Sequence, residues 1–276
     1  MSDTSPVSLV CCDLAGAIVS DGSVLEKAFS EAIGTQGVVP GTAAYARRMV
    51  QVDRSGGAPP VDVMHMLFSQ DDAQAQAAYV AFERSYRAII DRFGLTAAPG
   101  AMEAISKLSG SHVKVCLISG FSQPINRLVL DRLGMTRHAD LALCLDDVPR
   151  GCPWPDLVLM AVIRLGIEDV ADVAVVGDSE NVMIAGRRGG AGTRVGIAGA
   201  RTESRLRQAG ATHVIGVMAD LPDLLLRPAG PEPGAADRGT VEGQKACEPQ
   251  DRDSPRHRRT GIVPPQVTLR GKHAGL

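Results

Sequence analysis

Residues 8–22 read SLVCCDLAGAIVSDG, and this stretch decides the fold. A short run of Leu, Val and Cys reaches Asp13, after which come the small residues Ala15, Gly16 and Ala17. The run is too short for a typical helix and is typical of a strand buried on both faces, as in a parallel sheet. An acid at the end of such a strand, surrounded by so little side chain, indicates a turn kept open for a ligand.

Similar apolar runs recur along the chain, with helical patterns between them. The further predicted strands are 113–118, 141–145, 173–177, 193–198 and 213–217. The predicted helices between them are 101–109, 122–133, 155–165, 180–189 and 202–209. Alternating strands and helices predict an α/β fold with a doubly wound parallel sheet and a Rossmann-like core.

One long segment breaks this alternation. Residues 23–94 show helical patterns only, at 24–33, 42–51, 61–68 and 72–92. We therefore expect an all-helical cap domain over 23–94, inserted into an α/β core made of 1–22 and 95–227. Past that core, 228–276 is rich in Pro, Gly and charge, which predicts a disordered tail.

Composition excludes several classes of protein. The 276 residues carry 29 Lys and Arg against 31 Asp and Glu. The chain therefore lacks the excess of basic residues that is typical of nucleic-acid-binding proteins. No run of 18 apolar residues predicts a membrane span, and the first residues lack the basic segment of a signal peptide. The spacing of the six cysteines fits neither a zinc site nor a disulfide scaffold. We expect a cytoplasmic protein with reduced, buried thiols.

Four motifs follow predicted strands, where loops of a parallel sheet line a crevice. Asp13 ends the first strand, and Ser119 with Gly120 follows the second. The segment RGCPWPD (150–156) follows the third, and GDSEN (177–181) closes the fourth. Taken singly, an Asp at a strand end is commonly a turn former or a helix cap, and that alternative stays open.

The order of these motifs resembles the haloacid dehalogenase superfamily over about residues 7–220. The family pattern of strand-Asp, Thr or Ser, a Lys or Arg before P-x-P, and G-D-(T/S) corresponds to CCDLAGA, LISGF, GCPWP and VVGDSEN. Ala15 stands where most phosphatases of the family carry a second Asp. Members of the phosphonatase-like branch, which resemble phosphonoacetaldehyde hydrolase, carry Ala at this position, so the chain resembles that branch.

The resemblance implies a hydrolase with an aspartyl nucleophile, Asp13, and a Mg²⁺ cofactor. A carboxylate can attack phosphorus and hold the phosphoryl group as an acyl phosphate. Because the nucleophile and a phosphate dianion repel each other, a cation between them is needed, and Mg²⁺ takes oxygen ligands. Asp13, the backbone carbonyl of Ala15 and Asp178 are the expected metal ligands.

Four further residues are expected to bind the substrate. Ser119 and its amide, at a predicted helix N-terminus, suit phosphate oxygens, and Gly120 follows directly. Gly16 lets backbone amides approach the phosphate closely. Cys152 occupies the place of the motif's Lys or Arg, so it is expected to lie against the substrate without supplying charge.

The chain departs from the family pattern at several positions. Ala17 replaces a Thr, and Val182 stands where a second acid supports the metal. Phosphonate-cleaving relatives use a cap lysine to form an imine, but no lysine lies between 28 and 106, and Pro60 occupies the aligned place. Lys27, the remaining lysine of the cap, has the position of an ordinary helix-surface residue.

A replacement for the missing cation could come from nearby arginines. The candidates are Arg150, Arg187 and Arg188, for each of which surface solvation is the alternative. His65 lies on a cap helix, where it either faces the crevice or packs between helices.

We expect Mg²⁺-dependent hydrolysis of a phosphoryl group from a small phosphorylated or related anionic substrate. A catalytically impaired protein that keeps the fold and only binds a ligand is the main alternative, and metal-independent dehalogenation of a 2-haloacid is a further one. No nucleic acid or membrane is expected as a partner. The sequence leaves open whether the chain forms a homodimer.

Overall fold

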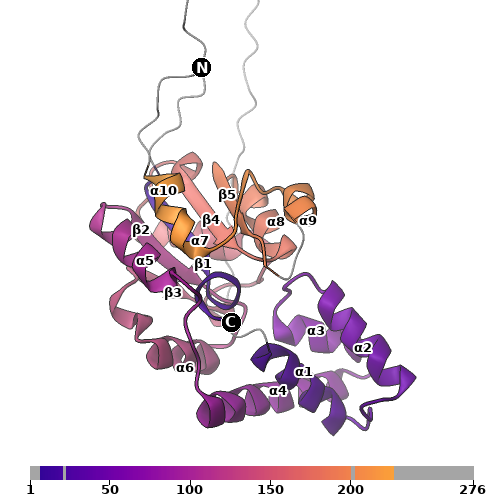
Figure 1. The fold of residues 1–276 in the computed structure, drawn as a ribbon. Helices are drawn as coiled ribbons and strands as arrows, with labels where there is room; N and C mark the ends of the chain where they lie inside the picture. The colour runs from indigo at the N-terminus through magenta and orange to yellow at the C-terminus, as the bar shows by residue number, and fades with distance from the viewer. Residues whose placement is uncertain (1–6, 21–22, 200–202, 227–276) are drawn as a thin grey trace, which may run out of the picture. The chain divides into compact units, whose positions relative to one another are not determined.

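All six apolar runs form strands, and the strands form a single parallel sheet. The computed structural model describes residues 7–20, 23–199 and 203–226. The strands are β1 (Leu9–Asp13), β2 (Lys114–Ile118), β3 (Leu141–Leu143), β4 (Val173–Gly177), β5 (Thr193–Ile197) and β6 (His213–Ile215). Their order is β3-β2-β1-β4-β5-β6, and every neighbouring pair is parallel (Figure 1).

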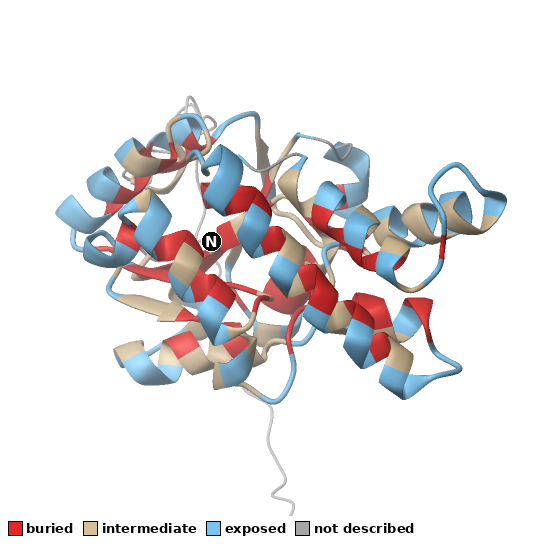
Figure 2. Ribbon diagram, turned by 90° about the horizontal axis from the view of Figure 1, so that it is seen from below, coloured by how far each residue is buried: buried red, intermediate tan, exposed pale blue. Residues whose placement is uncertain are grey.

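Helices cover both faces of the sheet, because alternate strand residues point to opposite faces. Val10 and Cys12 of β1 belong to one apolar cluster, whereas Leu9 and Cys11 belong to another. The first cluster includes α5 (Ala101–Gly110), α6 (Gln123–Leu133) and α10 (Leu221–Leu225). The second includes α7 (Asp156–Leu165), α8 (Glu180–Gly189) and α9 (Glu203–Ala209). Figure 2 shows the buried helix faces in red against the sheet. The predicted doubly wound, Rossmann-like α/β fold is confirmed.

Over the described residues 23–94, the regular secondary structure is helical, and we call this segment the helical insert. Its helices are α1 (Val24–Thr35), α2 (Ala43–Arg54), α3 (Pro60–Leu67) and α4 (Asp72–Phe93), grouped in indigo and purple in Figure 1. Phe29 and Phe82 join α1 to α4, with ring centroids 4.6 Å apart. The boundaries proposed for this insert as a separate cap domain remain predictions. The predicted tail, 228–276, lies outside the described residues.

The chain enters and leaves the helical insert at one place. Val19 and Ala97 form an isolated antiparallel bridge, and the Ala98 N–H donates to the Ile18 carbonyl at 2.7 Å. All described residues belong to one unit of the chain, Met1–Gly230, so these are contacts within that unit. The segment that leads into the insert and the segment that leads out of it are therefore hydrogen-bonded to each other beside the end of β1.

A second connection joins the insert to the sheet through aromatic rings. Tyr86 of α4 stacks on Phe82 with centroids 5.8 Å apart, and Phe121 in the loop after β2 lies 5.0 Å from Tyr86. In the same region the Ser122 hydroxyl contacts the Glu83 carboxylate of α4. The loop after β2 is therefore held by both apolar and polar contacts with α4.

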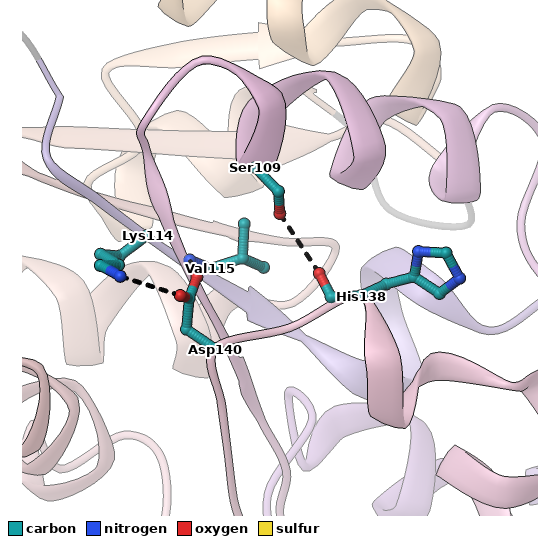
Figure 3. A network of polar contacts seen from close by, with 5 residues as sticks. All are labelled: Ser109, Lys114, Val115, His138 and Asp140. Atoms are coloured by element: carbon teal, nitrogen blue, oxygen red, sulfur yellow. Dashed lines mark hydrogen bonds and ion pairs between the residues drawn. The ribbon is translucent and has the colours of Figure 1, made fainter.

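A polar network ties β3 to β2 at their amino ends, opposite the candidate site (Figure 3). Asp140 accepts from Lys114 Nζ at 3.0 Å and from the Val115 N–H at 2.9 Å. Ser109 Oγ donates to the His138 carbonyl at 3.3 Å. Partial burial would raise the pKa of Asp140, but the bonds from Val115 and Lys114 outweigh it and hold that pKa below its ordinary value.

Composition-based expectations about thiols and membranes can be compared with the described residues. The five cysteines within them, Cys11, Cys12, Cys116, Cys144 and Cys152, are buried and unpaired, whereas Cys247 lies outside them. Among the helices that the structure describes, none combines the length and apolar character that a membrane crossing requires.

Candidate active site

The four motifs lie at the carboxyl ends of strands that are neighbours in the sheet. Asp13 is the last residue of β1, Ser119 follows β2 directly, and Asp178 follows β4 directly. In the order β2-β1-β4, the strand sequence reverses direction between β1 and β4. Ligands of open α/β sheets bind at this kind of switch point. Asp13 and Asp178 therefore flank the expected ligand crevice.

The two carboxylates converge on Gly16. A methyl group added at Gly16 would clash with Asp178 Oδ1, and both this oxygen and Asp13 Oδ2 lie within 2.8 Å of the point that the added carbon would occupy. Both acids are half-buried. Only glycine leaves room for the two side chains here, so the structure brings together two residues far apart in the sequence.

The turn after Asp13 is a single π-helical turn, η1 (Leu14–Ile18). The Val19 N–H closes it on the Leu14 carbonyl at 3.0 Å. Turns of this kind are rare and are often found at functional sites. A five-residue stretch, Leu-Ala-Gly-Ala-Ile, is too short to show a period that could predict it. The turn brings Gly16 next to the Asp13 carboxylate.

The residues present fit a hard divalent cation with few protein ligands. Mg²⁺ is commonly held by one or two carboxylates and keeps several waters, with oxygen ligands at ~2.1 Å. Asp13 and Asp178 offer carboxylate oxygens around one point, and Ala15 belongs to the turn that directly follows Asp13. Across 7–20, 23–199 and 203–226, no group of three or more His, Cys, Asp or Glu side chains could hold a metal ion.

Ser119 is buried, at 2% exposure, and its role differs in one respect from the prediction. Its hydroxyl oxygen accepts from the Phe121 N–H at 3.0 Å, which forms a tight turn and leaves the O–H proton able to donate. The helix that follows begins at Gln123 with Ser122 as its N-cap. The prediction that Ser119 and Gly120 stand at the helix N-terminus was therefore wrong, because a turn separates them from it.

Cys152 lies near Asp13, where the motif's cation was expected. Burial, and after it the negative charge of Asp13, raises the pKa of the Cys152 thiol to about 12. The thiol is therefore neutral at pH 7, so it is neither a cation nor a thiolate nucleophile.

Val182 and Asp13 both lie against Gly177. A methyl group added at Gly177 would come within 2.9 Å of Val182 Cγ1 and 3.2 Å of Asp13 Cβ. Ser179 is the N-cap of α8, and its hydroxyl accepts from the Val182 N–H at 3.4 Å. The side chain beside Asp13 at this position is thus apolar and offers no oxygen.

The arginines near the third motif are held by other partners. Arg150 forms two hydrogen bonds with Asp156, at 3.0 and 2.8 Å, and its guanidinium lies 4.3 Å from the centre of the Trp154 ring. Arg188 lies 4.7 Å from the same ring and donates to the Pro153 carbonyl at 2.9 Å. Arg187 packs its chain against Gly210. These contacts favour the surface role for all three.

Two residues of the insert also have partners outside the crevice. His65 is paired with Asp72 at the start of α4, with Nδ1 3.0 Å from the carboxylate. Lys27 lies over the Phe93 ring, 5.9 Å from its centre. Both arrangements agree with the structural alternatives given for these residues.

Sequence reasoning missed Asn181, although it quoted the motif that contains it. Asn181 Nδ2 donates to the Ser55 carbonyl at 2.9 Å, and the Asn181 N–H donates to the Gly56 carbonyl at 3.2 Å. Ser55 and Gly56 belong to the loop between α2 and α3. No local pattern could have found this contact, because its two partners are distant in the sequence.

Comparisons with known proteins agree with this fold and motif order. A family model described as haloacid dehalogenase-like hydrolase matches residues 7–190. Phosphonoacetaldehyde hydrolase of Pseudomonas paraeruginosa is 38% identical over 93 residues, which make up 33% of this chain and 34% of that protein. The match thus spans about a third of the length of this relative.

Two solved structures share the fold. A hydrolase from Pseudomonas syringae has a TM-score of 0.69 and 24% identity, and the match covers 79% of this chain and 97% of that one. A phosphonoacetaldehyde hydrolase-like protein from Oleispira antarctica has a TM-score of 0.69 and 19% identity, over 81% and 92% of the two chains. At these identities the likeness concerns the fold alone. The family model over residues 7–190 confirms the predicted resemblance to the haloacid dehalogenase superfamily, and the partial match to phosphonoacetaldehyde hydrolase agrees with the predicted branch. The chain belongs to the haloacid dehalogenase-like hydrolases.

Proposed function

We propose that the protein hydrolyses a phosphoryl group from a small phosphorylated substrate, with Asp13 as the nucleophile and Mg²⁺ as the cofactor. The observation that carries the proposal is the convergence of Asp13 and Asp178 on Gly16. Asp13, Asp178 and the Ala15 carbonyl would hold the ion. When bound, Mg²⁺ would offset the repulsion between the attacking carboxylate and the phosphate dianion.

The proposed reaction has two steps, in which Asp13, Ser119 and water have separate roles. An Asp13 oxygen attacks phosphorus, the bond from phosphorus to the leaving oxygen breaks, and an acyl phosphate remains on Asp13. Water then cleaves the acyl phosphate, which releases phosphate and restores the carboxylate. Ser119 donates its O–H proton to a phosphate oxygen. Since Ala15 has no acidic group, the leaving oxygen takes its proton from water.

A protein that binds without turnover is the second candidate, and a specific observation favours it. The cation that would hold nucleophile and phosphate together is replaced by the neutral thiol of Cys152. Losing one electrostatic stabiliser of a charged transition state typically costs ~10²- to 10³-fold in rate. Slow turnover is therefore expected under the first proposal, and none under the second.

Phosphate release over a panel of phosphoesters, with and without Mg²⁺, tests the proposal. The Asp13→Asn variant is expected to lose all Mg²⁺-dependent release, because an amide cannot attack phosphorus. Asp131→Asn, which changes an exposed acid on α6, is the matched control and should keep wild-type rates. Unchanged turnover in Asp13→Asn would refute the nucleophile. Ligand binding by calorimetry without product from any substrate would establish the binder instead.

A further inference from the structure

The loop between α2 and α3, residues 55–59, packs against the core beside the candidate site; we call it the insert loop. Its Pro59 is buried between two core glycines. A methyl group added at Gly120 would lie 3.3 Å from Pro59 Cα, and one at Gly151 would lie 2.5 Å from Pro59 Cγ. These glycines directly adjoin Ser119 and Cys152. Pro59 therefore sits over two of the loops that carry candidate substrate-binding residues.

The insert loop meets the third of these loops through Gly57. A methyl group added there would come within 2.6 Å of both Cβ and Oγ of Ser179, the residue after Asp178. Gly57 also has a φ of 81°, in the left-handed region that favours glycine. Both the close approach and the backbone conformation thus require a residue without a side chain.

Asn181 fastens the insert loop to the core. The first N–H groups of a helix have no partner within the helix. At the start of α8, the N–H of Asn181 finds its acceptor in the Gly56 carbonyl, and Asn181 Nδ2 adds a bond to the Ser55 carbonyl. The insert loop thereby completes the first turn of a core helix that begins two residues after Asp178.

The composition of the insert loop limits what it contributes. Its sequence, Ser-Gly-Gly-Ala-Pro, contains no ionisable side chain. It can exclude a large group by its shape, but it can neither donate a proton nor neutralise a charge.

Two cavities lie elsewhere, about 380 Å³ between α4 and α6 and about 320 Å³ at the amino ends of β2 and β3, and no candidate residue lines either.

We propose that Asn181 is a positioning residue that holds the insert loop as a roof over the crevice, and that this roof restricts the site to substrates with a small group beyond the phosphoryl. The restriction to small substrates rests on the proposed function, whereas the fastening of the loop does not. Loosening the roof should therefore expose the start of α8 and admit larger substrates.

Hydrogen exchange measures the fastening without any reaction. Because the N–H at position 181 donates to Gly56, its protection factor reports whether the loop is docked. Asn181→Ala keeps this N–H but removes the bond to Ser55, and one hydrogen bond is worth about fivefold in protection. Gly57→Ala should lower the protection at least as much. Gly37→Ala is the matched control: its φ is 80°, but nothing lies within 4 Å of the added methyl. Unchanged protection of the Val175 and Val176 amides in β4 verifies that the variants stay folded.

Substrate preference tests whether the roof restricts the size of the substrate. The ratio of kcat/KM for 4-nitrophenyl phosphate to that for acetyl phosphate should rise about fivefold or more in Asn181→Ala and Gly57→Ala, and stay constant in Gly37→Ala. Protection at position 181 that is unchanged in both variants would overturn the role of Asn181. If protection falls but the ratio does not change, the size restriction is refuted. If the wild type releases no phosphate, the proposed function and the restriction both fail, and the exchange result still decides the fastening.

Discussion

Cys152 puts a neutral thiol close enough to Asp13 to feel its charge, in a region where the reaction of a carboxylate with a phosphate dianion would gain from a cation. The thiol is 8% exposed and its pKa is raised to about 12, so it carries no charge at pH 7. Arg150 and Arg188 are held against the Trp154 ring and do not compensate in this arrangement. The rate at Asp13 should therefore be limited by missing positive charge.

Replacing Cys152 by lysine is expected to raise kcat/KM by about 100-fold, since one electrostatic stabiliser is worth roughly this factor. The larger side chain should also cost about 1–3 kcal/mol of stability through overpacking. Cys152→Met, which adds length without charge, is the control and should bring no gain in rate. Phosphate release under saturating Mg²⁺ measures the rate of each of the two variants. Equal rates in the lysine and methionine variants would contradict the role assigned to charge.

Part of the site was predictable from single residues, and part was not. Asp13 and Asp178 could be placed together because the carboxyl ends of parallel strands meet at one edge of a sheet. The position of Ser119 relative to its helix could not, since Ser119 and Ser122 are equally good caps by residue type. Asn181 was missed because its partners, Ser55 and Gly56, reach it only through the fold.

The edge strand β3 has only three residues, and a single acid supports it. Asp140 precedes it and binds both the Lys114 ammonium and the Val115 N–H of β2. Because these bonds favour the charged form, the pKa of Asp140 is lower in the folded protein than in the unfolded chain. The stabilisation is thus complete above the unfolded pKa of about 3.8 and is lost as the pH falls through the lower, folded value.

Asp140→Asn should therefore lower the free energy of unfolding at pH 7, and the difference from the wild type should shrink below about pH 4. Urea denaturation between pH 3 and pH 7 measures it. Asp131→Asn on α6 is the control, because Asp131 takes no part in the bonds between β2 and β3. Its free energy of unfolding should differ little from that of the wild type at pH 3 or at pH 7. A deficit in Asp140→Asn that stays constant across this range would show that the charge is not what matters.

Strands and helices were predicted well because each carries its own apolar pattern. Strand β4 has the predicted limits, and the others differ by a few residues at their ends. The π-helical turn η1 was not predicted, because a stretch of five residues is too short to show a distinctive period. The strand order was not predicted either, since a list of buried strands does not state which ones are neighbours. Pairing of β1 with both β2 and β4 depends on the packing of the helices between them.

The proposed ion joins the first strand to the fourth, so it should stabilise the whole folded molecule. A ligand that binds only the native state adds RT ln(1 + [L]/Kd), or about 1.4 kcal/mol at ten times Kd. For a chain of this size that is an increase in Tm of about 3–6 °C. The unfolded chain separates Asp13 from Asp178 and should bind far more weakly.

Thermal unfolding with and without Mg²⁺ measures this increase, and a chelator should reverse it. The increase is expected to vanish in Asp13→Asn and in Asp178→Asn, because each variant removes one carboxylate from the pair around Gly16. Asp131→Asn should keep it. The same increase in all three variants would mean that the ion acts elsewhere on the protein, and would remove the support for a shared site.

The bridge between Val19 and Ala97 has a consequence for how such a chain can diverge. The two ends of a four-helix segment emerge side by side from the sheet, already hydrogen-bonded to each other. Lengthening, shortening or exchanging that segment therefore leaves the pairing of β1 with β2 and β4 undisturbed. Evolution can remodel what faces the ligand while the carboxylates beneath it keep their places.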